Sequence, residues 1–182
     1  MLQCSIHTPS SFICRYADQL LPNWSSPVSS VLIVLQRAGC DLLTRSRYTE
    51  NQKHQLRERF LEIGREIAAQ LKQRGYLADL FDPKTGHPLL SQPGQIRLDD
   101  VAVVQACLGY PTTEVEGCSL ILHPNWGSAA YPAVLLSTAE PEAVERLTSR
   151  VVWTGGWMDN EASRRTLSAY HHSLTGSGSL IQ

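Results

Sequence analysis

The sequence predicts an α/β protein of the α+β kind, with a mixed, largely antiparallel sheet and flanking helices. Segments typical of buried strands and of amphipathic helices interleave along the chain. Turn residues at 82–86 and 125–128 follow strand-like segments at once, which favours hairpins over a doubly wound parallel sheet. A chain of 182 residues is also long enough to bury a core without disulfide or metal support.

The first part of the chain contains one short helix and one strand. Three prolines interrupt residues 1–28, and only Phe12–Leu21 has the pattern of a helix, so the rest is expected to be irregular. Ser29–Arg37 is rich in aliphatic and β-branched residues. Such a short, continuous apolar segment is typical of a central strand that is buried on both faces.

The clearest predicted element is a long amphipathic helix that begins at Thr49. Thr49 and Gln52 have the spacing of a capping box, and Gly75 is placed to end the helix. Apolar residues recur every three or four positions and form one stripe, which predicts a face turned to the core. The stripe consists of Leu56, Phe60, Ile63, Ile67 and Leu71.

The second half alternates strands, turns and helices. Tyr76–Phe81 is a predicted strand that runs into the turn Asp82–Gly86, and Asp99 caps a helix that ends near Gly109. Cys118–His123 and Ala129–Thr138 are predicted strands with a turn between them, so we expect them to pair as a hairpin. A further helix starts at Pro141.

The predicted organisation is one domain over residues 1–150, with its core at about 21–150. Residues 151–182 form a C-terminal extension, whose Gly/Ser-rich end at 175–179 has the composition of a flexible tail. No internal repeat is present.

Charge and hydropathy exclude two classes of partner. Sixteen Lys and Arg residues against 17 Asp and Glu give a net charge of -1, which argues against nucleic acid as a partner. The longest aliphatic run is Val31–Leu35, far shorter than a membrane span, so no membrane is expected. Residues 1–20 show neither a secretory signal nor a transit peptide. Five scattered cysteines are typical of free thiols, and the expected location is cytoplasmic.

Cys118 is the thiol that we single out for function. It follows Gly117 at the start of a predicted strand, a place where side chains are commonly exposed, although Glu114 and Glu116 nearby disfavour a thiolate. His123 is a suitable metal ligand close by, but an odd separation along a strand directs two side chains to opposite faces. A joint metal site is therefore disfavoured, and the motifs of common nucleotide and hydrolase sites are absent.

Other polar and aromatic residues leave alternatives open. Asp79 lies in a predicted strand, either buried with a partner or at a wet edge. Trp153 and Trp157 flank two glycines and either cover a ligand or pin the extension to the domain. The adjacent residues His171 and His172 are either a solvated pair or a chelating pair. The favoured interpretations are that the tryptophans pin the extension and that the histidines are solvated.

Two segments carry a resemblance to a known family. The segment Gly75–Gly86 reads GYLADLFDPKTG, and Gly117–Gly127 reads GCSLILHPNWG. With the strand at Val31 and the long helix before them, they resemble the methylmalonic aciduria and homocystinuria type D protein family from about Leu21 to Leu147. The chain departs from the family in having Cys118-Ser119 in place of two successive cysteines.

The resemblance implies a role in vitamin B12 handling as an adaptor rather than an enzyme. It implies a nitroreductase-like, or flavin-reductase-like, fold without flavin, no cofactor bound by the chain alone, and a cobalamin-processing partner of the type C kind or another B12-dependent acceptor. Cys118 matches a family cysteine that can supply a thiolate to the cobalt of partner-held cobalamin. The alternatives are a flavin-dependent reductase of the same fold, acting on cobalamin or another small substrate, and a thiol-redox or metal-sensing module.

Overall fold

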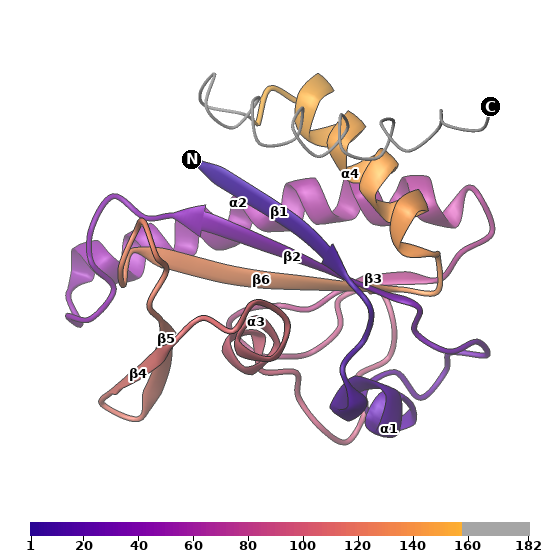
Figure 1. The fold of residues 1–182 in the computed structure, drawn as a ribbon, viewed down its shortest axis with the longest axis horizontal. Helices are drawn as coiled ribbons and strands as arrows, with labels where there is room; N and C mark the ends of the chain where they lie inside the picture. Colours follow the sequence, from indigo (N-terminus) through magenta and orange to yellow (C-terminus); the bar gives the residue numbers. More distant parts are fainter. Residues whose placement is uncertain (158–182) are drawn as a thin grey trace, which may run out of the picture.

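The fold is built on a four-stranded antiparallel sheet with helices on both faces (Figure 1). The computed structural model describes residues 1–157. The strand order is β1-β2-β6-β3, and every neighbouring pair is antiparallel. The strands are β1 (Leu2–His7), β2 (Ser30–Arg37), β6 (Ala130–Ser137) and β3 (Ala78–Leu80). This confirms a mixed α/β architecture with an antiparallel sheet.

Strand β2 is the central strand that its composition predicts. It pairs with β1 on one side and with β6 on the other, and all its residues except Arg37 are buried. Leu32 and Val34 belong to the core under α2 and α4, whereas Val31, Ile33 and Leu35 belong to the core on the opposite face. A strand with both faces covered needs apolar side chains in both registers, which explains the unbroken apolar run.

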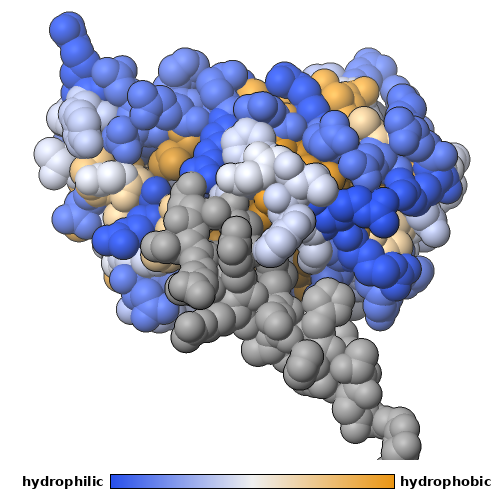
Figure 2. Space-filling view, turned by 90° about the horizontal axis from the view of Figure 1, so that it is seen from above, coloured by the Kyte–Doolittle hydropathy of each residue, from blue (hydrophilic) through white to orange (hydrophobic). Residues whose placement is uncertain are grey.

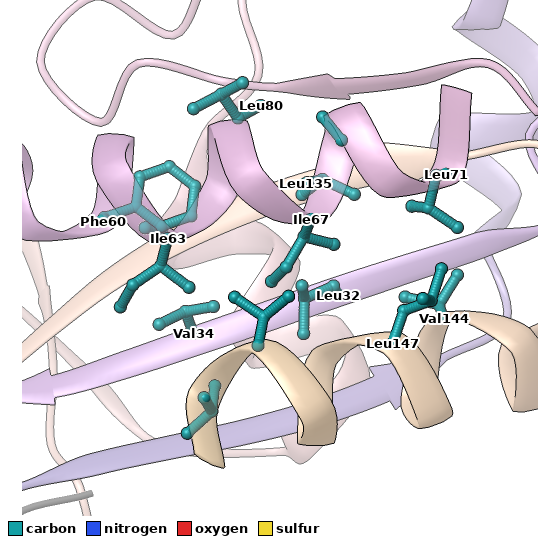
Figure 3. Packing of buried hydrophobic residues seen from close by; sticks show 14 of the residues in the cluster. Leu32, Val34, Phe60, Ile63, Ile67, Leu71, Leu80, Leu135, Val144 and Leu147 are labelled. Carbon is teal, nitrogen blue, oxygen red and sulfur yellow. The ribbon is translucent and has the colours of Figure 1, made fainter. Parts of the chain in front are cut away.

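The first helical layer consists of α2 (Arg47–Lys72) and α4 (Pro141–Thr154). All five residues of the predicted stripe on α2 are buried, and Figure 3 shows four of them pointing into the core. At Gly64, an added Cβ would come within 3.0 Å of the Leu80 side chain, so this glycine permits a close approach of α2 to β3. The visible outer surface of this layer is mostly hydrophilic (Figure 2).

The second layer consists of α1 (Ser11–Leu20), α3 (Asp100–Leu108) and a two-stranded ribbon. The ribbon pairs β4 (Thr112–Val115) with β5 (Cys118–Ile121) and lies apart from the main sheet (Figure 1). The predicted Asp99 cap is confirmed, because its carboxylate accepts hydrogen bonds from the backbone N–H groups of Val101 and Ala102.

One predicted pairing and one segment predicted to be irregular are wrong. The segment after Cys118 does not form a hairpin with Ala129–Thr138, because β5 pairs with β4 while β6 lies between β2 and β3. Burial explains the difference: β6 is apolar enough for the sheet interior, whereas Cys118 and Ser119 are exposed. Residues 2–7, expected to be irregular, form the edge strand β1, so Cys4 lies on a strand. Cys14 lies on α1, which overlaps the predicted helix Phe12–Leu21.

Two element boundaries also differ from the prediction. The α2 N-cap is Ser46, whose Oγ accepts from the backbone N–H of Thr49, and Gln52 instead accepts from the backbone N–H of Gly39. A serine three residues earlier serves the same capping geometry, so the helix gains about one turn. The strand predicted over Tyr76–Phe81 is shorter as a regular strand, Ala78–Leu80, although Leu77 and Phe81 still form backbone hydrogen bonds with the β6 side.

The C-terminal helix extends past residue 150, where the predicted domain ends. Val151 and Val152 of α4 are buried in the core. Trp157 packs against the same core, and its backbone oxygen accepts a hydrogen bond from Arg59 at 2.8 Å. Within residues 1–157, no helix combines the length and apolar character that a membrane crossing requires.

Candidate functional site

The candidate site is the tip of the β4–β5 ribbon, where a two-residue turn positions Cys118. Glu116 and Gly117 both have positive φ, 50° and 75°, as a tight antiparallel hairpin requires. Val115 and Cys118 are the paired residues next to this turn. The Glu-Gly sequence thus closes the ribbon and places the thiol at its end.

Cys118 is exposed, as its sequence position predicts. Cys14 is the other exposed cysteine within the described chain, whereas Cys4, Cys40 and Cys107 are half-buried. Burial raises the pKa of the Cys4 thiol to about 12 and also raises the pKa of Cys107. An unreactive protonated thiol is therefore favoured at these two positions, and solvent reaches the sulfur of Cys118.

The base of the ribbon is anchored, while its tip is held by surface contacts. Ile121 is 1% exposed and belongs to the core on the α3 side of the sheet, and the N–H of Leu122 donates to the Pro111 carbonyl. At the tip, the Arg45 guanidinium lies 3.7 Å from the Glu116 carboxylate, and both side chains are exposed. The cation offsets the negative charge of Glu116 at the ribbon tip.

His123 is a structural residue in a turn next to the ribbon. Its Nδ1 accepts from the backbone N–H groups of Asn125 and Trp126, so Nε2 carries the proton and donates to Gln3 Oε1 at 3.0 Å. The ring stacks on Trp126 with centroids 4.1 Å apart and meets Tyr110 edge-on. Burial lowers the pKa of His123.

Both ring nitrogens of His123 are therefore occupied, and the structure does not combine this residue with Cys118. Within residues 1–157, no group of three or more His, Cys, Asp and Glu side chains is placed to hold a metal ion. The predicted pair His171 and His172 lies outside the described residues.

Asp79 is buried with partners and does not lie at a wet edge, which decides between the two alternatives that the sequence leaves open. The residue is 0% exposed, and its Oδ1 accepts from the backbone N–H groups of Leu89 and Leu90, both at 2.9 Å. Its role is to hold residues 88–90 against the β3 edge. Trp157 is packed as the pinning interpretation expects, whereas Trp153 is 60% exposed.

An ion pair that sequence patterns do not predict joins α2 to the turn after β3. Arg57 binds Asp82 through two nitrogens, Nε to Oδ1 at 2.6 Å and Nη2 to Oδ2 at 3.0 Å. Burial alone would raise the pKa of Asp82, but bonds from Arg57, the Lys84 N–H and Thr85 outweigh it and lower the pKa. No local pattern connects residues 25 positions apart, so only the fold reveals this pair.

Asp100 lies close enough to this pair to feel its charge. Burial, followed by the negative charges of Asp99 and Asp82, raises the pKa of Asp100 well above its usual value. The Oδ1 atom of Asp100 is buried and makes no hydrogen bond to any of the described residues. The fold therefore favours the protonated acid at the start of α3.

Comparisons with known proteins agree with the resemblance in the sequence. The family model described as methylmalonic aciduria and homocystinuria type D protein matches residues 1–148. The proteins named cobalamin trafficking protein CblD of Homo sapiens and Mus musculus are 24% identical to this chain, and that of Gallus gallus is 22% identical. Each match covers 142 residues, which is 78% of this chain and 48% of the relative.

The chain thus spans about half the length of the curated relatives it matches. The family match begins at residue 1, ahead of the first residues that carry the sequence resemblance, and it includes all strands of both sheets. It also includes Cys118 and the turn that presents it. The chain belongs to the methylmalonic aciduria and homocystinuria type D protein family.

Proposed function

We propose that this chain is a cobalamin trafficking adaptor that presents Cys118 to the cobalt of cobalamin held by another protein. The partner would be a cobalamin-processing protein of the type C kind or another B12-dependent acceptor. The observation that carries this proposal is the exposed thiol at the tip of a ribbon that projects from the body of the molecule (Figure 1). A projecting thiol can enter a cavity on a partner, where a buried one cannot.

The anchoring of the ribbon supports a presenting role. Ile121 fixes the base of β5 in the core, so the direction of the hairpin is set by the domain. The tip carries no buried side chain at Glu116, Gly117, Cys118 or Ser119. The partner can therefore surround the tip without disturbing the core of the adaptor.

The chemistry of the sulfur also fits. A thiolate is a soft ligand, and coordination to a metal cation deprotonates a thiol that is otherwise neutral. Binding to cobalt should accordingly release a proton.

The adaptor proposal includes the absence of catalysis and of a flavin bound by the chain alone, on a nitroreductase-like fold. The names of the relatives, which describe trafficking, support this part of the proposal. The absorption spectrum of the purified protein tests this part. A flavin spectrum retained in stoichiometric amount would instead favour a flavin-dependent reductase.

A spectral titration tests cobalt coordination by Cys118. The protein is added to cobalamin bound to a type C processing protein, and the visible spectrum of the corrin is followed. We expect a shift as sulfur replaces the axial ligand, and we expect Cys118→Ser to abolish it, because a hydroxyl is a harder and poorer ligand. Cys14→Ser is the matched control, since Cys14 is the other exposed cysteine of residues 1–157.

The control variant should behave as the parent protein does. The same shift in Cys118→Ser as in the parent would rule out coordination by this sulfur. A pull-down with and without cobalamin then separates the two parts of the proposal. If Cys118→Ser still captures the partner, the chain is an adaptor that acts through surface contacts. If neither the parent protein nor any variant captures a partner, the adaptor role itself is contradicted.

A further inference from the structure

The outer edge of β1 presents a row of backbone groups without partners among the described residues. The Arg37 N–H donates to the Met1 carbonyl, which makes residues 1 and 37 a hydrogen-bonded pair in the β1–β2 register. Gln3, Ser5 and His7 therefore direct their N–H and C=O groups toward β2. Leu2, Cys4 and Ile6 direct theirs away from the sheet, and none of these groups bonds to a described residue.

The opposite edge of the same sheet is closed by the chain itself. The outward carbonyl of Leu80 on β3 accepts from the Leu89 N–H at 3.1 Å, and the Asp82 N–H donates to the His87 carbonyl at 2.9 Å. Asp79 holds this covering segment through two further hydrogen bonds. Strand β3 is also short, with 3 residues against 6 in β1.

Strand β1 lacks the features that usually protect an exposed sheet edge. Its sequence, LQCSIH, contains no Lys, Asp, Glu, Pro or Gly, and its register with β2 is continuous and has no bulge. Edges of this length and composition readily pair with another strand. In Figure 1, β1 is the strand nearest the viewer, and no helix crosses in front of it.

We propose that a second copy of this chain covers this edge, by antiparallel pairing of β1 with β1 about a two-fold axis at Cys4. In that register Cys4 faces Cys4 of the other copy, and Leu2 faces Ile6. These are the residues whose backbone groups point outward, so every free donor meets a free acceptor. Shifting the register by two residues would leave part of the row unpaired.

Side chains and charge agree with self-pairing. Leu2, Cys4 and Ile6 all lie on the α2/α4 side of the sheet, so the pairing extends one apolar surface into an eight-stranded sheet of 4 + 4 strands. Neither copy brings a charged Lys, Arg, Asp or Glu side chain to β1, and the net charge of -1 leaves little repulsion between copies. The ribbon with Cys118 lies on the other side of the sheet and remains accessible.

Amide hydrogen exchange measured by NMR tests the proposal with an internal control. The outward amides of Cys4 and Ile6 should exchange at least about 10-fold more slowly at high protein concentration than at low concentration. The inward amides of Gln3 and Ser5 are paired with β2 in either state, so their protection should not follow concentration. Sedimentation equilibrium should show a dimer over the same concentration range.

A pair of variants at one position tests the register. Cys4→Pro removes an outward N–H and no bond to β2, so the dimer should be lost while Ile33 and Val134 in the sheet interior keep their protection. Cys4→Val keeps the N–H and an apolar side chain, and the dimer should remain. If Cys4→Pro also loses protection in the interior, the Cys4→Val protein is the test. Its outward amide at Ile6 should still become more protected as the protein concentration rises, and no such rise would contradict the proposal.

Three results would overturn the proposal. A monomer with unprotected Cys4 and Ile6 amides at all concentrations would show that the edge stays open or serves another protein. Protection of these amides in a monomer would show that the chain closes its own edge. A dimer in which they remain unprotected would place the interface elsewhere.

Discussion

The main sheet and the β4–β5 ribbon use the same antiparallel pairing in opposite surroundings. In β2 and β6, apolar side chains are buried on both faces, whereas the ribbon buries one residue, Ile121. Stability follows burial of apolar surface, so the sheet supports the fold and the ribbon tip contributes little. The candidate functional cysteine therefore lies where a sequence change destabilises the fold least.

The largest expected effect is in the core under α2. Ile67 is 0% exposed between α2 and the sheet, so Ile67→Ala should lower the free energy of unfolding by about 2–5 kcal/mol. Urea denaturation followed by circular dichroism measures this change. A loss below about 0.5 kcal/mol would mean that the stripe contributes no more than a surface residue.

The next effect concerns the ion pair that fixes the turn after β3. Asp82→Ala removes the acceptor for Arg57, the Lys84 N–H and the Thr85 hydroxyl, and should cost about 1–3 kcal/mol. Because the bonds lower the folded-state pKa of Asp82, its contribution is present above the unfolded pKa and is lost as pH falls through the folded pKa. Stability of the variant should therefore depend less on acid pH than that of the parent.

Asp100 should show the opposite sign. Its folded-state pKa is raised, so its contribution to stability is fully present below the unfolded pKa of 3.8 and is lost as pH rises through the folded pKa. Asp100→Asn removes the charge, and should raise the thermal midpoint at pH 7 while leaving it nearly unchanged at pH 3. A lower midpoint at pH 7 would mean that the ionised carboxylate is stabilising there.

A smaller and local effect is expected in the ribbon turn. Gly117 has a φ of 75°, so Gly117→Ala adds strain of about 1 kcal/mol to the hairpin. Glu116→Gly is the matched variant, because it relieves a positive φ in a non-glycine residue. Amide exchange in β4 and β5 should quicken in the first variant and slow or stay unchanged in the second, with β2 unaffected in both.

The smallest effect on stability is expected at Cys118. Because the side chain is exposed at the ribbon tip, Cys118→Ser should change the free energy of unfolding by less than about 0.5 kcal/mol. The same urea denaturation measures it. A loss comparable to that of Ile67→Ala would contradict the contrast between sheet and ribbon, and it would show that the thiol packs into the fold.

Local patterns predicted the elements whose structure depends on neighbours in sequence. The α2 stripe, the Asp99 cap, the helix at Pro141 and the buried strand around Val31 are confirmed. The edge strand β1 also has a local pattern: Leu2, Cys4 and Ile6 alternate with polar residues, as in a half-buried strand. The three prolines in residues 1–28 favoured irregular structure over this strand.

Pairing between distant segments could not be predicted in the same way. Cys118–Ile121 has strand character, but its partner β4 is short and polar, and the better apolar match was the neighbouring segment that became β6. Which strands pair depends on which surfaces are buried together, and this is a property of the whole chain. Because such contacts depend on the whole chain, the hairpin was predicted with the wrong strand, and the Arg57–Asp82 pair was not predicted.

Sequence patterns alone identify the helix faces, the central strand, the exposed cysteine and the family to which the chain belongs. Only the folded chain shows that Cys118 projects on a separate ribbon and that His123 is fully hydrogen-bonded in a turn. The fold also shows that, within residues 1–157, one sheet edge is covered while the other is open. Periodicity and capping act over a few residues, so they can be recognised in the sequence. Strand pairing, burial of polar groups and edge coverage arise from contacts between residues far apart in sequence, so they require the folded chain.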